Sequence, residues 1–390
     1  MRSWWRVLGV VAVVGALSLG AWAEKLVVIG PWSGAEADPF VAVLDAFKAK
    51  TGIDYEYRTM RAEDLSKVLP AQFSAGMAPG DLIFMWGWWI AKFAEHMVDL
   101  SDVIADVPFA YVNPLVVEGR TVGVPYVVFV KPGFWYRKSF FETHGLKAPS
   151  TWAEFFGLFP KIKAIPGVED AAASGDGVGW PLSDTVEHFI LAVGGKDLFL
   201  DLTAGKVQWQ SPEVKAIFEH FIVPYIEHAS EPIEWTSALD LWWEGKYGIY
   251  FMGNWITGMV GDPSDLGVFA LPGAKAVTGG PDIFFVPKYS KDLEAAKKLA
   301  AFLMSKEGQE LRAAGGGKLV VRADVSPTAY PPAERALMKA LEGFTLVSDM
   351  DDTIGGEWQA AFWDQLKLLW VKPEALDDVL RVLDEKFPKG

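Results

Sequence analysis

Residues 25–40, KLVVIGPWSGAEADPF, join a short apolar run to a turn and then to the start of a helix. The run KLVVIG predicts a buried strand that Gly30 and Pro31 end. Asp38-Pro39 is typical of an N-cap followed by proline in the first helical turn. We therefore expect a strand–turn–helix unit with Trp32 on the loop at the strand tip, where it would contribute little to the core.

The next segments repeat this alternation of strand and helix. IDYEYR (53–58) predicts a strand, AEDLSKVLPAQFSAG (62–76) a helix, and DLIFMWGWW (81–89) a third strand that runs into three tryptophans. Alternating units of this kind favour an α/β fold, and the chain length suggests two domains. No linker or repeat interrupts the pattern, so the chain must cross between domains within ordered structure.

The N-terminus predicts export. Residues 1–23 combine two arginines, an apolar stretch and the small-x-small site Ala21-Trp22-Ala23, as in a cleaved signal peptide; an uncleaved anchor is the alternative. No second stretch is long enough to cross a bilayer, so we expect a soluble protein in the periplasm or at the cell surface. Cysteine is absent, which excludes disulfides and a lipid on a cysteine. The net charge of −14 argues against nucleic acid as a partner.

Tryptophan is the unusual feature of the composition, with 18 in the chain. Trp32, Trp86, Trp180 and Trp255 follow strand ends or lie in turns, with Asp, Asn or Ser nearby. Ligands bind at the carboxyl edge of open α/β sheets. Aromatic faces beside carboxylates or amides suit a sugar, whose C–H face packs on the ring while its hydroxyls form hydrogen bonds.

Core packing is the competing interpretation of a large aromatic residue. Trp363 and Trp370 belong to a stretch with an i, i+4 apolar stripe, and we expect both in the core. Trp242 and Trp243 lie in a helix that Gly245 ends, and we expect the same of them.

Enzyme motifs are missing from the sequence. The histidines show no metal-ligand spacing, and we expect them on the surface or at helix caps: His96, His144, His188, His220 and His228. Gly315-Gly316-Gly317-Lys318 lacks the first glycine of a P-loop and predicts a turn. The acidic run from Asp349 is not a calcium loop. We predict no cofactor, no metal and no catalytic residue.

Two alternatives to a sugar-binding protein stay open. A glycoside hydrolase needs two carboxyl groups at roughly 5 Å or 6.5–9.5 Å, a separation that a sequence does not give. A cavity with acidic residues and aromatic walls also suits organic cations, so the ligand could instead be a polyamine, a compatible solute or a nucleoside.

Five segments, in order, resemble the extracellular solute-binding proteins of ABC sugar importers. The most specific is VGVPYVVFVKPGFWYRKSFFETHGLKAPSTWAEF (122–155). The others are residues 26–58, 80–103, 244–258 and 282–313. They are spread along the chain, and the resemblance extends over essentially all of it after residue 23. The resemblance implies a binding protein that captures a small carbohydrate between two lobes, closes by hinge bending and delivers it to the permease of an ABC transporter.

Within that family the chain is most similar to the α-glucoside-binding branch. The branch pattern W-S-G-x-E-x-D-x-F is matched from Trp32 to Phe40, G-W-P-x-x-D at residues 179–184, and G-G-x-D at residues 279–282. Near the C-terminus, Asp351 and Asp352 stand where the branch is usually apolar or proline. This departure affects the identity of the sugar more than the class of protein.

The resemblance implies a type II periplasmic-binding-protein fold: two lobes, each an α/β sheet, joined by three crossings. We place the crossings at 124–133, 279–285 and 320–327. The predicted N-terminal lobe comprises 24–128 and 284–323, and the C-terminal lobe 129–283 and 324–390. We expect a monomer.

The strand ends and the resemblance together define a predicted ligand site. We expect Asp38, Asp184, Asp282 and Asp349, with Glu36 weaker, to accept hydrogen bonds from sugar hydroxyls. Helix capping is the alternative role for Asp38. The predicted ligand-binding residues are Trp32, Ser33, Gly34, Glu36, Asp38, Arg61, Trp86, Trp88, Tyr126, Trp180, Asp184, Asn254, Trp255, Gly280, Asp282, Asp349 and Trp358.

Overall fold

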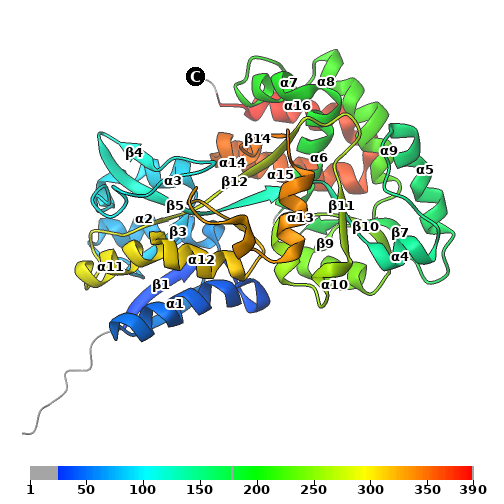
Figure 1. The fold of residues 1–390 in the computed structure, drawn as a ribbon. Coiled ribbons are helices and arrows are strands. Elements are labelled where there is room, and N and C mark those ends of the chain that lie inside the picture. The colour runs from blue at the N-terminus through cyan, green and yellow to red at the C-terminus, as the bar shows by residue number, and fades with distance from the viewer. Residues whose placement is uncertain (1–24, 177–178, 389–390) are drawn as a thin grey trace, which may run out of the picture.

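A computed structural model describes residues 25–176 and 179–388 of the chain (Figure 1). The predicted signal peptide, residues 1–23, lies outside the described residues. Within those residues, no helix combines the length and the apolar character that a membrane span requires.

Two main sheets organise the molecule. The larger has eight strands in the order β13-β5-β12-β3-β1-β2, with β14 paired to β12 and β4 to β5. Its strands are β1 (Leu26–Gly30), β2 (Tyr55–Thr59), β3 (Leu82–Met85), β4 (Leu115–Val117), β5 (Arg120–Lys131), β12 (Ala276–Phe285), β13 (Leu319–Val320) and β14 (Thr345–Val347). The pairs β1–β2, β1–β3 and β12–β14 are parallel, whereas β5, β12 and β3 pair antiparallel.

The smaller sheet has the order β11-β6-β10-β7. Its strands are β6 (Phe134–Arg137), β7 (Asp170–Ala173), β10 (Tyr247–Phe251) and β11 (Leu266–Phe269). Beside it, β8 (Gly175–Asp176) pairs with β9 (Ile233–Glu234). The mixture of parallel and antiparallel pairs with covering helices is an α/β fold, as predicted.

Helices cover both sheets and divide the molecule into two lobes. In the first lobe the large sheet packs with α1 (Asp38–Thr51), α2 (Ala62–Ser74), α3 (Gly87–Lys92), α11 (Leu293–Met304) and α12 (Lys306–Ala314). In the second lobe the small sheet packs with α4 (Lys138–Thr143), α5 (Trp152–Lys163), α6 (Trp180–Val193), α7 (Gly195–Thr203), α8 (Pro212–Ile217), α9 (Val223–Ile226), α10 (Trp235–Trp243), α14 (Met350–Ile354), α15 (Gly356–Val371) and α16 (Leu376–Lys386).

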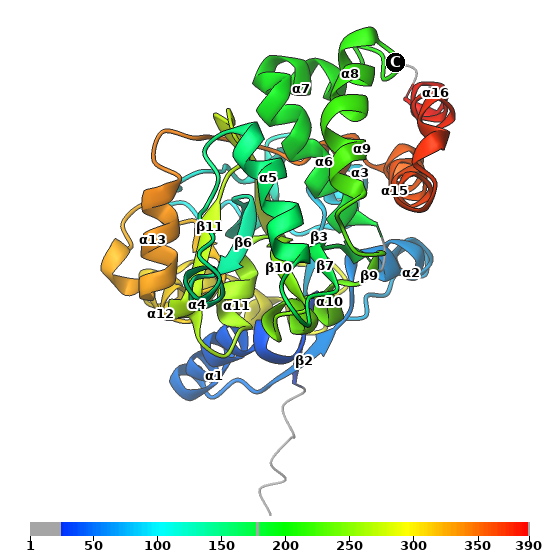
Figure 2. The same ribbon diagram turned by 90° about the vertical axis from the view of Figure 1, so that its right-hand side faces the viewer.

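One more helix, α13 (Pro332–Ala340), packs Leu337 into the aromatic core of the second lobe. Figure 2, which looks onto this lobe, shows α13 on one side of the small sheet and α15 with α16 on the other.

The long strands β5 and β12 connect the lobes. Phe284 near the end of β12 belongs to the core of the first lobe, whereas Ala276 at its start belongs to the core of the second. The two strands pair from Thr278–Lys131 to Phe284–Val124. The lobe boundaries given above, at residues 128, 283 and 323, stay predictions.

The first strand–turn–helix unit forms largely as the sequence predicts. β1 covers Leu26–Gly30, and α1 ends at Gly52, whose φ of 73° is the left-handed conformation of a C-cap glycine. The predicted cap is wrong: Ala37 occupies the N-cap position, and Asp38 is the first helical residue, with no capping hydrogen bond from its side chain.

Candidate functional site

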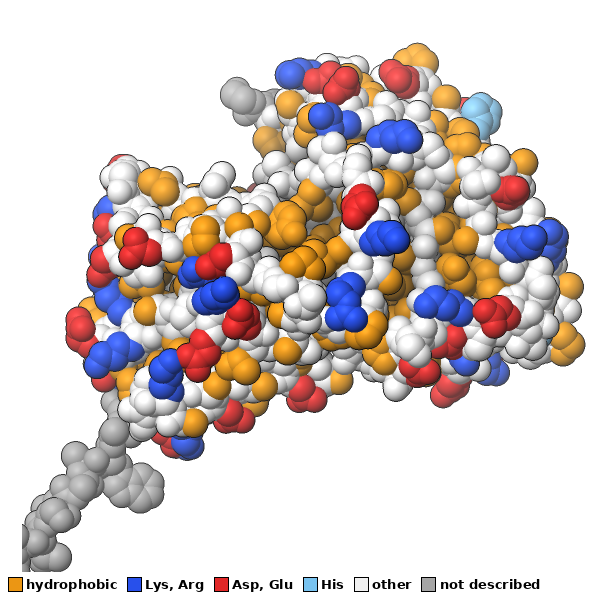
Figure 3. Space-filling model, in the orientation of Figure 1, with side chains coloured by type: hydrophobic (Ala, Val, Ile, Leu, Met, Phe, Trp, Pro, Cys, Tyr) orange, Lys and Arg blue, Asp and Glu red, His pale blue; other side chains and the backbone are white. Residues whose placement is uncertain are grey.

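A cavity of about 530 Å³ lies between the two lobes. The first lobe contributes the end of β1, the 3-10 turn η1 (Gly34–Glu36), the start of α2 and the residues after β3. The second contributes the starts of α6 and α10 and the 3-10 turn η4 (Asn254–Gly258). Figure 3 shows one face of the molecule, on which hydrophobic side chains gather between the two lobes. Strand ends and helix starts thus form the site, as expected for an α/β fold.

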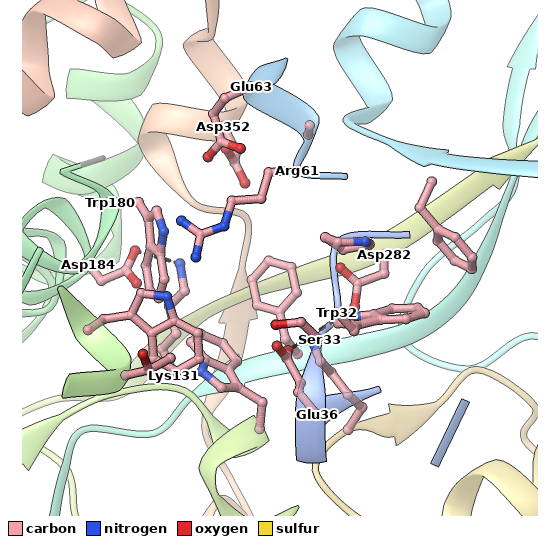
Figure 4. Close-up of a pocket in the computed structure, with 18 of the residues that line it drawn as sticks. Trp32, Ser33, Glu36, Arg61, Glu63, Lys131, Trp180, Asp184, Asp282 and Asp352 are labelled. Atoms are coloured by element: carbon pink, nitrogen blue, oxygen red, sulfur yellow. Dashed lines mark hydrogen bonds and ion pairs between the residues drawn. The ribbon is translucent and has the colours of Figure 1, made fainter. Parts of the chain in front are cut away.

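Ten of the predicted ligand-binding residues line this interlobe cavity: Trp32, Ser33, Gly34, Glu36, Arg61, Trp86, Trp180, Asp184, Trp255 and Asp282. In Figure 4, Trp180 and Asp184 lie on one side, and Trp32, Ser33, Glu36 and Asp282 on the other. Arg61 reaches between the two sides. Whether these residues contact a ligand stays a prediction.

Lys131, at the end of β5, holds two of the predicted carboxylates. Its ammonium nitrogen lies 2.5 Å from Oδ1 of Asp184 and 3.0 Å from Oδ2 of Asp349, and all three side chains are almost fully buried. The ammonium group also lies 5.1 Å from the centre of the Phe129 ring. The lysine therefore fixes the direction in which both carboxylates point.

Lys318 likewise holds two predicted carboxylates close to the Phe129 ring. Its ammonium nitrogen lies 3.0 Å from Asp282 and 3.8 Å from Glu36. It is also 5.4 Å from the centre of the Phe129 ring, 5.2 Å from that of Trp255 and 5.9 Å from that of Trp32. Four of the five predicted carboxylates thus form two pairs, each around one lysine, and Asp38 belongs to neither pair.

Glu334 on α13 anchors the turn that carries Lys318. Oε1 of this buried carboxylate accepts a hydrogen bond from the backbone N–H of Gly317 at 2.8 Å and another from the hydroxyl of Thr257 in η4. Gly316 and Gly317 have φ values of 68° and 76°, which a β-carbon disfavours. Glu334 therefore ties the Lys318 turn to the element that carries Trp255.

Further buried acids surround the Lys131 end of the cavity. Burial raises the pKa of Asp184 and of Glu187 well above the usual range, although Lys131 opposes the shift. Burial also raises the pKa of Asp351 and Asp352. Asp351 is held by the hydroxyl of Ser183 at 2.6 Å and the indole N–H of Trp363 at 2.7 Å. Despite its own burial, Lys131 has a raised pKa because these carboxylates attract its charge.

His188 contradicts the expectation of a surface or capping role. It is buried, and its ring nitrogens lie 2.8 Å from the Asp184 carbonyl and 2.7 Å from the Lys131 carbonyl. The backbone N–H of Thr278 lies 3.3 Å from Nε2. Burial lowers the His188 pKa to about 4. The ring joins α6 to both connecting strands, so its role here is structural.

Seven predicted site residues do not line the cavity: Asp38, Trp88, Tyr126, Asn254, Gly280, Asp349 and Trp358. Asp38 is an exposed residue of α1. Asp349 does not reach the cavity but forms an ion pair with Lys131, which does line it. Trp358 is 1% exposed and stacks on Phe362 in the core of the second lobe, so we withdraw it as a ligand contact.

The remaining four support residues that do line the cavity. Trp88 stacks on Trp86 with ring centres 5.7 Å apart, and Tyr126 lies fully buried behind Trp32. Oδ1 of Asn254 accepts the backbone N–H of Val130 at 2.9 Å. Gly280 pairs with Phe129 in the β5–β12 ladder.

Several lining residues were not among the predicted ligand contacts, namely Glu63, Phe129, Lys131, Trp235, Asp240, Lys318, Asp351, Asp352 and Trp363. The prediction that Trp363 belongs to the core is wrong, because its indole lines the cavity and donates to Asp351. The departure from the branch pattern at Asp351-Asp352 was the one signal for these acids, and both lie in the cavity wall. No group of three or more possible metal ligands occurs in the described part of the chain.

Residues 32–310 match the family model of bacterial extracellular solute-binding proteins. The match spans more than half of the chain, which therefore belongs to this family. An uncharacterized ABC transporter extracellular-binding protein from Pyrococcus horikoshii is 52% identical, over 93% of this chain and 88% of the relative. A probable sugar-binding periplasmic protein of Rhizobium meliloti is 25% identical, over 87% and 86% of the two chains.

Solved structures agree on the fold. A bacterial solute receptor, AcbH, described with an exclusive preference for β-D-galactopyranose, superposes with a TM-score of 0.84 at 18% identity, over 93% of this chain and 98% of the other. A maltose-bound MalE3 of T. maritima gives 0.76 at 22%, with the same coverage. The type II binding-protein fold is confirmed. The chain is a solute-binding protein of the ABC transporter class rather than an enzyme.

Proposed function

We propose that the chain captures a small carbohydrate, an α-glucoside or other oligosaccharide, in the interlobe cavity and presents it to the permease of an ABC transporter. The observation that carries this proposal is the pairing of indole faces with carboxylates that lysines hold in place. Trp180, Trp235 and Trp255 form one wall, with ring centres 5.6–6.4 Å apart. Sugars need such flat apolar faces together with oriented acceptors.

Two buried polar atoms at the cavity support a hydroxyl-bearing ligand. Oδ2 of Asp184 and the indole N–H of Trp255 have no hydrogen-bond partner among the described residues. Leaving a buried polar group unpaired costs about 1–3 kcal/mol. A hydroxyl group both donates and accepts, so sugar hydroxyls satisfy atoms of either kind. An α-glucosides-binding protein of Rhizobium meliloti is among the relatives, at 25% identity over 51% of this chain.

The first prediction is binding without turnover. We expect titration calorimetry against mono- and disaccharides to give a dissociation constant in the micromolar range or below for at least one small glycoside, and no free sugar after prolonged incubation. Spermidine, glycine betaine and a nucleoside test the alternative solutes. Time-dependent hydrolysis at catalytic protein concentrations, or tight binding confined to a non-sugar solute, would overturn the proposal.

Closure of the two lobes on the ligand belongs to the same proposal. Arg61 of the first lobe lies 3.7 Å from Glu234 of the second, an ion pair that joins the lobes beside the cavity. A ligand that contacts Trp32 and Trp180 at once would bridge the lobes further and favour the closed arrangement.

The second prediction is therefore a compaction. Addition of a bound sugar should reduce the radius of gyration measured by solution scattering, and the Arg61→Gln variant should require more sugar for the same reduction. The scattering mass should correspond to a monomer. A saturating ligand that leaves the scattering curve unchanged contradicts closure but not sugar binding.

A further inference from the structure

The interlobe cavity carries more negative than positive groups. Its lining includes the carboxylates of Glu36, Glu63, Asp184, Asp240, Asp282, Asp351 and Asp352, but only the cations Arg61, Lys131 and Lys318. Each cation already has acidic partners: Lys131 has Asp184 and Asp349, Lys318 has Asp282 and Glu36, and Arg61 has Glu234. The excess is therefore not neutralised by the residues that line the cavity.

Four of these carboxylates have no ion pair among the described residues, namely Glu63, Asp240, Asp351 and Asp352. Asp352 and Glu63 are the two that lie together at one end of the cavity. Oδ1 of Asp352 accepts a hydrogen bond from the amide of Gln359 at 2.8 Å, and no cation lies within ion-pair distance among the described residues. Glu63 comes from α2 in the opposite lobe. Figure 4 shows both carboxylates at the same end of the cavity, beyond Arg61 and Trp180. Burial raises the pKa of each carboxyl group, although the charge of Arg61 opposes the shift of Glu63 and that of Lys131 opposes the shift of Asp352.

A second observation points to a donor group on the ligand. Asp184 is 1% exposed and lines the cavity on the side of Trp180, yet its Oδ2 has no hydrogen-bond partner among the described residues. Asp351 already accepts hydrogen bonds from Ser183 and Trp363. Oδ2 of Asp184 is therefore an unmet buried acceptor at the cavity wall and requires an N–H or O–H donor. Asp352 adds a carboxylate that has a hydrogen bond from Gln359 but no ion pair.

The surroundings of the two lysines show which groups stabilise an ammonium group in this cavity. Lys131 and Lys318 each lie between two carboxylates and within 6 Å of at least one aromatic ring. Such cation–π and ion-pair surroundings stabilise a desolvated ammonium group. Asp352, Glu63 and the rings of Trp180 and Trp363 provide the same chemical types at the cavity wall, without a resident lysine.

We propose that the solute is an amino-substituted sugar whose protonated nitrogen binds between Asp352 and Glu63 beside Trp180. This inference rests on the proposed sugar-binding function and narrows its substrate class. It also gives a role to Asp352, one of the two adjacent acids that depart from the α-glucoside-binding branch. The sugar ring would occupy the tryptophan wall, and the nitrogen would supply the charge that the cavity lacks.

The test compares matched ligands. Methyl α-glucoside and maltose are titrated beside derivatives in which one hydroxyl is replaced by an amine, and beside the N-acetylated forms of those derivatives. The measurements are made where the amine is protonated. We expect at least one amine to bind about tenfold more tightly than both its neutral parent and its N-acetyl form, the scale of one charge-assisted contact.

Variants locate the preference. Asp352→Asn keeps the shape of the side chain and should abolish most of the amine preference, and Glu63→Gln on the other lobe should reduce it. Asp282→Asn, at the Lys318 end, should weaken amine and neutral parent by the same factor. Thermal unfolding of each variant shows whether it is folded, and the ratio of the two affinities does not depend on the fraction of folded protein.

Each outcome separates the two proposals. Neutral sugars that bind as tightly as every amine, with a ratio that Asp352→Asn leaves unchanged, overturn the amine inference and leave the sugar proposal intact. Tight binding of putrescine or spermidine with no binding of any sugar overturns the sugar proposal. If none of these ligands binds, both fall.

Discussion

Replacing Lys131 by methionine will lower the free energy of unfolding by about 3–5 kcal/mol, the usual cost of removing one partner from a buried ion pair. The variant leaves Asp184 and Asp349 buried at 1% side-chain exposure without their cation. Methionine retains most of the aliphatic volume, so the loss reports the charge rather than a cavity. Urea-induced unfolding of the ligand-free protein measures it.

The loss should depend on pH in a defined direction. Without Lys131 the pKa of the Asp184 carboxyl group rises further above the unfolded-state value, so the folded variant binds more protons than the unfolded chain. Protons therefore stabilise the folded variant, and its deficit should be smaller at pH 5 than at pH 8. The double variant Lys131→Met/Asp184→Asn is the control and should recover part of the loss. A deficit below about 1 kcal/mol at pH 8, or one that grows on acidification, would contradict a buried ion pair here.

Replacing Trp32 by alanine should cost both stability and affinity. Trp32 is 3% exposed and packs against Phe84 and Phe40, with ring centres 4.7 Å and 4.9 Å away. Truncation of a buried tryptophan costs about 3–5 kcal/mol of unfolding free energy. The part of the Trp32 indole that lines the cavity would be lost as well. Sugar binding should therefore weaken at temperatures where the variant is still folded. This replaces the expectation that a residue on a loop tip contributes little to the core.

Trp180→Ala is the matched control. Trp180 also lines the cavity but is only partly buried, at the start of α6. It should lose affinity with a smaller loss of stability than Trp32→Ala. Chemical unfolding and sugar titration on both variants separate the effects. Equal stability losses for the two variants would show that Trp32 is not the larger core contributor.

Local sequence signals identified much of the site. Trp32, Trp86, Trp180 and Trp255 were predicted from their places after strands or in turns, and all four line the cavity. The reason is geometric, because parallel strand ends meet at one edge of a sheet. Sequence patterns could not distinguish Trp358 from them, since burial of a helical tryptophan depends on which neighbours cover its helix. The same limitation placed Trp363 in the core.

The two lysines of the site could not be predicted from local sequence patterns. Lys131 ends a nearly continuous buried strand, and Lys318 follows three glycines, so neither carries a local signal for a binding site. Their importance comes from partners far along the chain: Asp184 and Asp349 for Lys131, Glu36 and Asp282 for Lys318. Only the packing of several elements brings these groups together, since Asp184 lies on α6, Asp349 precedes α14, Glu36 lies in η1 and Asp282 lies on β12.

The sequence by itself determined the alternating α/β architecture, the class of protein and the tryptophan-rich edge of the site, because hydrophobic periodicity, turn residues and family motifs are local. The tertiary structure decided which carboxylates face the cavity and which are satisfied behind it. It also decided that Trp32 is a core residue, and that Asp352 and Glu63 from different lobes lack a cation. Charge compensation and burial depend on groups that lie far apart in the chain, so they arise only when the lobes are assembled.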